Sequence, residues 1–348
     1  MKPPFFSVVL PTWNRSAYIK SVISLIREQT FTDFEIIIQD NASTDRTEEE
    51  VKSLNDPRIR YYRNRHFLPF YKNIQKAILH ARGKYIFLLG DDDYILFKGT
   101  FLRLAEIIKK QKYGFIRLNF LERKFYEPGL QKIYHDNRHD IVIDRGSQSK
   151  KILDFFEEIH IGHLAGLVFK NEKIKKEDFF DSEISPWVRI LFKNTKKYGA
   201  LFLSSHYVVI SIAVITDIYP AYDAIKNKRL MYEYFMDNIA DLLPPGQFKK
   251  YTSDYYHRFI PLLPCVKFYS NNLNLLQFSR RLIIAEPAIR NKYLFWVYLF
   301  VSFLIPRFIF ALMRLIQHRL KNKINNLGNL TQIYRRYSDI AYSYPIFR

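Results

Sequence analysis

Residues 84–94 read KYIFLLGDDDY, a short apolar run that stops at three consecutive carboxylates, Asp91, Asp92 and Asp93. The apolar part is typical of a buried strand, and the aspartates follow where the chain leaves the sheet. Adjacent carboxylates repel one another, so three of them at the end of a core strand favour a bound cation. Mg²⁺ and Mn²⁺ take oxygen ligands and share them with substrate phosphates. The alternative is a solvated acidic turn that caps a helix beginning near Lys98.

Strands and helices alternate along the sequence before this stretch. The apolar runs that predict strands are residues 5–10, 34–39 and 58–63. The expected helices run to about Gln29, start near Arg46, and span residues 70–81, and Gly83 is expected to end the last of them. This alternation predicts an α/β fold with a mostly parallel sheet, in which ligands bind beyond the carboxyl ends of the strands.

Polar residues follow three of the predicted strand ends. Asn14, Asp40 and the Asp91–Asp93 triplet should therefore converge on one rim of the sheet. Carboxylates from two separate strand ends suit a nucleotide and its metal ion, one binding the base or ribose and the others the ion. Neither a Gly-x-Gly-x-x-Gly nor a Gly-x-x-x-x-Gly-Lys-Ser/Thr phosphate loop is present, which argues against dehydrogenases and P-loop proteins.

Four segments in order resemble the family 2 glycosyltransferases. They are SVVLPTWNR at 7–15, QTFTDFE at 29–35, DNASTD at 40–45, and GKYI at 83–86 leading into Asp91–Asp93. The resemblance covers roughly the first 120 residues well and the next 90 loosely. It implies the GT-A fold, a Rossmann-like nucleotide-binding αβα sandwich, and transfer of a sugar from a nucleotide-sugar donor, usually with inversion.

The resemblance also implies a set of donor-binding residues. Asp40 matches the aspartate that contacts the nucleoside, and Asp91 and Asp93 match a DxD-type motif that holds Mn²⁺ or Mg²⁺, with Asp92 turned to the ribose or sugar. The other implied contacts are Pro11, Thr12, Asn14, Asn41 and Lys72. Asn14 has an alternative role as a helix cap. Lys72 stands where many relatives have an arginine, but residues 66–69 (HFLP) replace the usual glycine-containing pattern before it.

The reaction needs a cation for the leaving nucleoside diphosphate and a general base for the acceptor hydroxyl. The family usually keeps a catalytic Asp or Glu in the region that corresponds to residues 179–191. Glu183 fits best, because Trp187 and Arg189 follow it, and Asp181 is second. The alternative is that both acids stabilise a helix N-terminus. His160 and His163 precede a predicted strand at 164–170, which would form the floor of the acceptor site. The spacing of the two histidines does not predict a zinc site.

Composition bounds the remaining possibilities. The content of 48% hydrophobic and 17% aromatic residues indicates a folded chain, and the single Cys265 excludes an intramolecular disulfide. With no charged leader followed by a secretory apolar segment, the expected location is cytoplasmic. The net charge of +20 favours a polyanionic partner, meaning a nucleic acid or an anionic membrane surface.

The C-terminal third has a mainly helical pattern from about Asp217, broken at residues 243–246. Residues 293–306 form an uncharged apolar run, short against the roughly 20 residues of a spanning helix. The basic residues that flank it are Arg280, Arg281, Arg290, Lys292, Arg314, Arg319, Lys321 and Lys323. Basic flanks with Trp296 at headgroup depth predict a helix lying on an anionic membrane. The alternatives are a buried core helix, or a spanning helix that includes Arg307.

The sequence therefore predicts a catalytic GT-A domain at residues 1–215 and a helical region at 216–348, with a membrane-attachment segment at about 280–323. The expected protein is a metal-dependent inverting transferase, peripheral or monotopic on the cytoplasmic face of the inner membrane. It would move a sugar, most simply from a UDP-sugar, to a glycan or lipid-linked glycan of the cell surface, without binding nucleic acid. The alternatives are a nucleotidyltransferase of related fold, a basic nucleic-acid-binding protein, and a membrane scaffold without catalysis.

Overall fold

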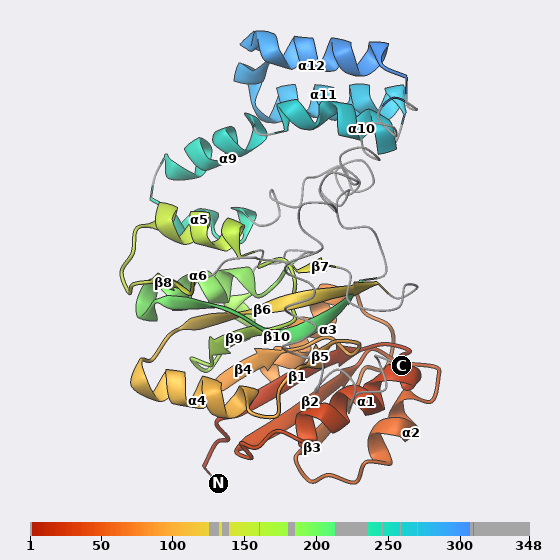
Figure 1. The fold of residues 1–348 in the computed structure, drawn as a ribbon, viewed down its shortest axis with the longest axis vertical. Helices are drawn as coiled ribbons and strands as arrows, with labels where there is room; N and C mark the ends of the chain where they lie inside the picture. Colours follow the sequence, from red (N-terminus) through yellow and green to blue (C-terminus); the bar gives the residue numbers. More distant parts are fainter. Residues whose placement is uncertain are drawn as a thin grey trace. The chain divides into compact units, whose positions relative to one another are not determined.

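The computed structural model describes residues 2–124, 132–133, 139–159, 161–179, 185–212, 236–244, 246–257, 259–269, 271–306 and 309. The chain divides into two compact units, Met1–Ala213 and Val214–Arg348. The first unit is built on one large sheet, and the described part of the second is helical (Figure 1).

Four parallel strands form the first half of the sheet, in the order β3-β2-β1-β4. They are β1 (Phe6–Thr12), β2 (Phe34–Asp40), β3 (Ile59–Arg63) and β4 (Tyr85–Leu88). Every residue of β1 and β2 is buried, so both faces of the sheet are covered there. Thr12 stands opposite Asp40 in the register, which brings the polar ends of these two strands side by side.

Three helices between these strands and one after them contribute to the core. They are α1 (Ser16–Arg27), α2 (Thr47–Lys52), α3 (Phe70–Leu79) and α4 (Thr100–Lys110). Helix α3 packs on β1 and β2 and buries Ile74, Ala77 and Ile78. The ring of Phe101 on α4 contacts the rings of Phe6, Phe34 and Phe87, one from each of three neighbouring strands. These apolar contacts hold β1, β2 and β4 at fixed positions, which in turn fixes the polar rim.

Gly83 does not end helix α3, so that prediction is wrong. The helix ends at Leu79, and His80 follows it in a helical conformation. A Cβ atom at Gly83 would lie 2.5 Å from the backbone nitrogen of Ser7. The amide of Gly83 donates a hydrogen bond to the Ser7 hydroxyl at 2.8 Å. Glycine is therefore required here because the chain passes close to β1 as it enters β4.

The second half of the sheet is mixed. Strand β9 (Leu167–Lys170) runs antiparallel between β4 and β6 (Phe115–Lys124), and β10 (Ala200–Ile212) runs parallel to β6. Three short antiparallel strands complete the sheet: β5 (Tyr94–Ile95), β7 (Lys132–Ile133) and β8 (Ile141–Ile143). The helical elements of this half are α5 (Ser149–Glu158), η1 (Lys176–Asp178) and α6 (Val188–Tyr198). The predicted α/β fold is confirmed, with antiparallel pairing entering at β9.

The second unit is a set of short helices. They are η3 (Ala240–Leu242), α9 (Gln247–His257), η4 (Ile260–Leu262), α10 (Leu263–Tyr269), α11 (Asn272–Ala285), η5 (Pro287–Asn291) and α12 (Tyr293–Leu304). Leu263, Leu275, Phe278 and Phe295 belong to its apolar core. Within the residues that the structure describes, no helix has the length and apolar character needed to cross a membrane.

Candidate active site

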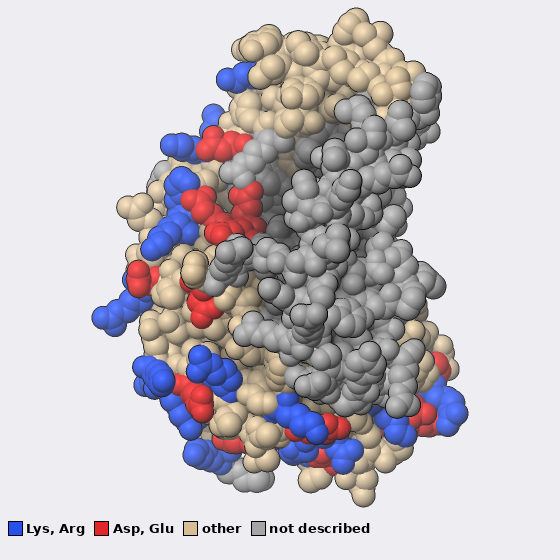
Figure 2. Space-filling model, in the orientation of Figure 1, with Lys and Arg blue, Asp and Glu red and all other residues tan. Residues whose placement is uncertain are grey.

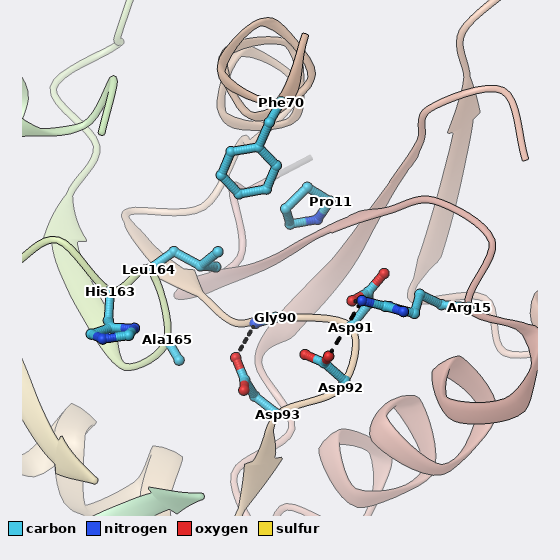
Figure 3. Close-up of a pocket in the computed structure, with 10 residues that line it drawn as sticks. All are labelled: Pro11, Arg15, Phe70, Gly90, Asp91, Asp92, Asp93, His163, Leu164 and Ala165. Carbon is cyan, nitrogen blue, oxygen red and sulfur yellow. Dashed lines mark hydrogen bonds and ion pairs between the residues drawn. The ribbon is translucent and has the colours of Figure 1, made fainter. Parts of the chain in front are cut away.

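A cavity of about 230 Å³ lies beyond the carboxyl ends of β1 and β4 (Figure 3). The residues that line it are Pro11, Arg15, Phe70, Gly90, Asp91, Asp92, Asp93, His163, Leu164 and Ala165. The cavity therefore opens at the rim to which the sequence assigned the acidic triplet.

The turn Gly90–Asp93, called the acidic turn below, is folded tightly on itself. The Asp93 carboxylate accepts a hydrogen bond from the Gly90 amide at 2.9 Å, and Asp93 is only 6% exposed. A Cβ atom at Gly90 would lie 2.2 Å from the Asp93 Oδ2 atom. The position of the Asp93 carboxylate thus depends on residue 90 having no side chain.

Arg15 faces the other two carboxylates of the acidic turn. Its Nε atom lies 3.5 Å from Asp91 Oδ1 and its Nη2 atom 3.6 Å from Asp92 Oδ2. Burial, and then the neighbouring charge of Asp92, raise the pKa of Asp91 to about 7. Burial also raises the pKa of Asp92, although Arg15 opposes the shift. Arg15 therefore compensates the two carboxylates only in part, and a cation beside them would favour their ionised forms.

The loop after β1 is joined to the loop after β2. Asn14 has a positive φ of 51°, and its side-chain oxygen accepts a hydrogen bond from the Thr44 amide at 2.8 Å. The Asn14 amide donates to the Ser43 hydroxyl at 2.8 Å. Asn14 is not the cap of α1, because Arg15 occupies that position. Its contacts instead lock the two loops of the rim together.

Asp45 and Thr47 bind the first amides of α1 from the neighbouring loop. The Ser16 amide donates to Asp45 Oδ2, and the Arg15 amide donates to Thr47 Oγ1, each at 3.0 Å. Burial opposes ionisation of Asp45, but hydrogen bonds from Thr47 and Ser16 outweigh it and lower the pKa to about 2. An ionised carboxylate therefore orients the start of α1 and, with it, Arg15.

Asp40 is fully buried at the end of β2. Its Oδ1 atom accepts hydrogen bonds from the Ser43 amide at 2.9 Å and the Ser43 hydroxyl at 2.6 Å, and its Oδ2 atom accepts one from the Tyr61 hydroxyl. Arg63 Nε lies 3.7 Å from Oδ2. Both carboxylate oxygens are therefore engaged within the protein, and they order the loop that follows β2.

Asn41 and Thr12 are buried beside Asp40. The Asn41 side chain donates to the Leu68 carbonyl at 2.7 Å and accepts from the Leu68 amide and from Asn64, each at 2.9 Å, so it fastens the segment that precedes α3. The Thr12 hydroxyl oxygen is buried, and its hydrogen bonding to the Asp91 carboxyl opposes the rise in the pKa of Asp91. Thr12 therefore links the end of β1 to the acidic turn.

The predicted site residues fall into three groups. Pro11, Asp91, Asp92 and Asp93 line the cavity. Thr12, Asn14, Asp40 and Asn41 form the rim behind it, while Lys72 is exposed on α3 with its amine 5.8 Å from the Tyr71 ring. Glu183, Asp181 and His160 lie outside the described residues.

Sequence reasoning missed Arg15, Phe70, Leu164 and Ala165 as lining residues and did not assign His163 a role. Arg15 belongs to the TWNR segment, so its position beside the quoted motif was an available signal. The other side chains reach the cavity from α3 and from the segment before β9. Only tertiary structure brings these segments together.

The acidic turn suits a divalent cation that is shared with a substrate. Among the described residues, no three side chains of His, Cys, Asp or Glu are grouped as a metal site. Mg²⁺ in nucleotide enzymes usually binds one or two carboxylates and completes its shell with phosphates and water. Asp91 and Asp92 fit such a shared ion. Their pKa values are raised by burial, and the arginine beside them, Arg15, is partly exposed.

Comparisons with known proteins give the family. Residues 7–176 match the model of Glycosyl transferase family 2. The chain is similar to the Campylobacter jejuni GalNAc(5)-diNAcBac-PP-undecaprenol beta-1,3-glucosyltransferase, with 28% identity over 56% of this chain and 62% of that protein. It is also similar to the Escherichia coli UDP-Glc:alpha-D-GlcNAc-diphosphoundecaprenol beta-1,3-glucosyltransferase WfgD, with 26% identity over 37% of this chain and 53% of that protein. Each match spans less than two thirds of the relative's length.

A solved structure gives the fold. The complex of S. aureus TarS 1-349 with UDP superimposes with a TM-score of 0.53 at 15% identity, covering 85% of this chain and 87% of that chain. At this identity the likeness concerns the fold, which is GT-A. Residues 7–176 therefore form a glycosyl transferase family 2 domain.

Proposed function

We propose that this protein transfers a sugar from a nucleoside-diphosphate-sugar to a lipid-linked glycan during synthesis of a surface polysaccharide. The observation that carries the proposal is the acidic turn, which faces a cavity at the strand ends of a family 2 domain. Two similar proteins are named for undecaprenol-linked diphosphate acceptors, which supports this acceptor class. UDP is the first nucleotide to test, because WfgD is named for UDP-Glc and TarS was solved with UDP.

The acidic turn would hold the diphosphate. Asp91 and Asp93 are the carboxylates that would bind Mn²⁺ or Mg²⁺, and the ion would stabilise negative charge on the departing diphosphate. Asp92 would face the ribose or the sugar. Arg15 lies 3.5 Å from Asp91, and its guanidinium has the planar fork that suits a phosphate. We infer that Arg15 exchanges part of its contact with the aspartates for the diphosphate when donor binds.

The nucleoside would lie over the ends of β1 and β2. Thr12, at the end of β1 beside Asp91, is a direct contact, and Pro11 lines the cavity. Asp40, Asn14 and Asn41 would act mainly by holding the two loops in place, since their polar atoms already bind protein groups. A contact with Lys72 would require its exposed side chain to turn toward the donor.

The chemistry is a single displacement. The acceptor oxygen bonds to the anomeric carbon as the bond from that carbon to the phosphate oxygen breaks, and the electron pair leaves with the diphosphate. Attack from the opposite face inverts the anomeric centre. The acceptor proton passes to a carboxylate base, for which Glu183 is the first candidate and Asp181 the second.

Two isosteric variants test the base. Glu183→Gln should lower sugar transfer by about 10²-fold or more while leaving donor affinity nearly unchanged, because a general base acts in the chemical step. Asp181→Asn should retain most activity. Rate and affinity are read from transfer kinetics and titration calorimetry. Equal losses in both variants, or full activity of Glu183→Gln, would contradict this assignment.

The overall activity is tested by direct assay. The purified protein would be incubated with Mn²⁺, one of several UDP-, GDP-, CDP- or dTDP-sugars, and lipid-linked saccharides extracted from bacterial membranes. We expect one donor to release its nucleoside diphosphate and to label the lipid, and EDTA to abolish both. Failure of every donor to label lipid or release nucleotide would reject the proposed function.

We infer that the C-terminal helices attach the protein to the cytoplasmic face of the membrane. Large apolar side chains of α12 are exposed, and the surface over α11 and α12 is mostly uncharged in Figure 2. The exposed ones on α12 are Tyr293, Leu294, Trp296, Val297, Phe300 and Leu304. Arg280, Arg290 and Lys292 are exposed in the same unit. Basic residues near an exposed apolar helix face suit an anionic lipid surface, where a lipid-linked acceptor also lies.

A further inference from the structure

One wall of the cavity has no role in the proposed function. It consists of His163, Leu164 and Ala165, and it precedes strand β9. In Figure 3 this wall lies on one side of the acidic turn, and Arg15 lies on the other. Leu164 and Ala165 are apolar, so His163 is the hydrogen-bonding side chain of the wall.

Strand order predicts which part of the donor meets this wall. The strands run β2, β1, β4, β9 along the sheet. Leu88 of β4 stands opposite Leu167 of the antiparallel β9, and the Gly166 amide donates to the Leu88 carbonyl at 3.0 Å. The residues just before β9 are thus next to the acidic turn. In a nucleotide-sugar the diphosphate joins the nucleoside to the sugar, so a nucleoside over β2 and β1 and a diphosphate at β4 leave the start of β9 for the sugar.

Two buried side chains hold the wall from beneath. Arg117 of β6 is 0% exposed, and its guanidinium donates to the Ile159 carbonyl at 3.3 Å and to the Ala165 carbonyl. Trp187 donates from its indole nitrogen to the Ile161 carbonyl at 2.9 Å. These bonds reach the backbone on both sides of His163 and fix the path of the segment.

The imidazole of His163 is also oriented by an aromatic neighbour. The Phe120 ring lies 5.6 Å from the His163 ring, and the Arg117 guanidinium lies 4.8 Å from the Phe120 ring centre. Arg117 therefore supports both the backbone and the ring neighbour of His163. Burying an arginine is costly, and two of the Arg117 donors are directed at this segment.

We propose that His163 hydrogen-bonds the transferred sugar of the donor and that Arg117 and Trp187 position it for this contact. The proposal rests on the proposed function, since it takes the acidic turn as the diphosphate site. It separates two parts of donor recognition. The rim over β1 and β2 recognises the nucleotide, and the wall before β9 recognises the sugar.

The test compares affinity for a nucleoside diphosphate with affinity for its sugar conjugates. Calorimetric titration in Mn²⁺ would use UDP with UDP-glucose, UDP-galactose and UDP-N-acetylglucosamine, and GDP with GDP-mannose. The quantity of interest is the ratio of the diphosphate Kd to the Kd of the best sugar conjugate. In His163→Ala this ratio should fall by about threefold to tenfold, the loss of one hydrogen bond, while the diphosphate Kd stays within twofold.

Further variants separate sugar contact from folding. His163→Gln keeps a side-chain donor, so its Kd ratio should lie between those of His163→Ala and the wild type. His139→Ala changes an exposed histidine outside the cavity and should leave the Kd ratio unchanged. Trp187→Phe removes the bond to Ile161 but keeps an aromatic ring in the core, and Arg117→Lys shortens the reach to the two carbonyls. Both should lower the ratio with little effect on the diphosphate Kd. A purely structural role would weaken diphosphate and conjugate equally.

The outcomes distinguish this inference from the function on which it rests. If none of UDP, GDP, CDP and dTDP binds the wild type, the donor site itself is wrong. If a diphosphate binds but the ratio is the same in wild type and His163→Ala, the sugar contact is overturned while the proposed function stands. A fall in the ratio at constant diphosphate affinity supports the inference.

Discussion

Gly90 and Asp93 fix the acidic turn through a single backbone hydrogen bond. A methyl group at Gly90 would lie 2.2 Å from Asp93 Oδ2 and 2.9 Å from its Cγ atom, so the carboxylate must turn away. We expect Gly90→Ala to lose about 1–3 kcal/mol of stability through this clash. It should also lose metal-dependent nucleotide binding. Denaturant unfolding and calorimetric titration with UDP and Mn²⁺ measure the two effects.

Gly99 provides the matched control for this prediction. A Cβ atom at Gly99 meets nothing within 4 Å, and its φ of −88° is open to any residue. Gly99→Ala should therefore leave stability and binding close to the wild type. Normal nucleotide binding by Gly90→Ala would show that the position of the Asp93 carboxylate does not matter to the site.

Asp56 gives a prediction about acid stability. A hydrogen bond from Arg58 is the largest influence on its pKa and, against the effect of burial, lowers it from 3.8 to about 2. A carboxyl whose pKa is lowered by folding stabilises the native state above its unfolded pKa, and this contribution disappears as pH falls from about 4 to 2. Arg58 and Arg27 are partly exposed, so screening limits the contribution to about 1–2 kcal/mol.

Urea unfolding of Asp56→Asn at several pH values measures this contribution. The variant should be less stable than the wild type at pH 7 and should approach it near pH 2–3. Asp154→Asn, which breaks an exposed pair between Asp154 and Lys150, should differ little from the wild type at either pH. A stability difference at Asp56 that does not depend on pH would contradict the assignment to its ionised form.

At the level of single residues, the sequence predicted where a residue lies along a strand better than which residues it bonds to. Asp40 was expected at the end of β2, and it is there, because a buried strand followed by a polar cluster is a local pattern. Its bonds to Tyr61 and Arg63 come from β3 and depend on parallel pairing. Local patterns carry no information about such partners, so the burial of Asp40 could not be predicted.

At the level of elements, the first four strands were predicted closely, whereas for β9 the strand was predicted but its place in the sheet was not. Strands β1 to β4 follow one another with helices between them, so alternation in the sequence predicts that they run parallel. Strand β9 instead inserts between β4 and β6, far from both in sequence. The predicted strand at 164–170 begins only at Leu167, because residues 163–165 turn to line the cavity.

Helix α12 carries the prediction about membrane attachment. Its two sides are both apolar, but Phe295 is buried in the core of the second unit while Phe300 is 64% exposed. Phe300→Glu puts a charge on the exposed side and should weaken binding to vesicles that contain anionic lipid, with unfolding unchanged. Vesicle flotation at low and high salt measures binding.

The matched control is an exposed leucine on a helix of the first unit. Leu102→Glu on α4 adds the same charge at a side chain that is 43% exposed, and vesicle binding should be unaffected. Equal vesicle binding by Phe300→Glu and the wild type would show that α12 is not the attachment surface. Equally strong binding to neutral and anionic vesicles would show that the basic residues do not contribute to attachment.

At the level of the whole molecule, charge alone left two partner classes open. A net charge of +20 attracts nucleic acid as well as anionic lipid. The family assignment, which rests on residues 7–176, favours a nucleotide-sugar as the ligand of the first unit. The sequence could predict this family because its motifs lie at strand ends and keep their order along the chain. It could not predict the sugar, because the wall before β9 is assembled from distant segments.

The central claim is that the acidic turn holds a nucleotide through a divalent cation. Thermal unfolding of wild type, Asp93→Asn and the surface control Asp154→Asn tests it, with UDP, GDP, CDP or dTDP, each with and without Mn²⁺. A ligand that binds only the native state stabilises it by about 2.7 kcal/mol at 100 times its Kd. We predict that one nucleotide raises the midpoint of the wild type and of Asp154→Asn only with Mn²⁺, and that Asp93→Asn loses this shift. Equal shifts in Asp93→Asn, or no shift with any nucleotide, would contradict the claim.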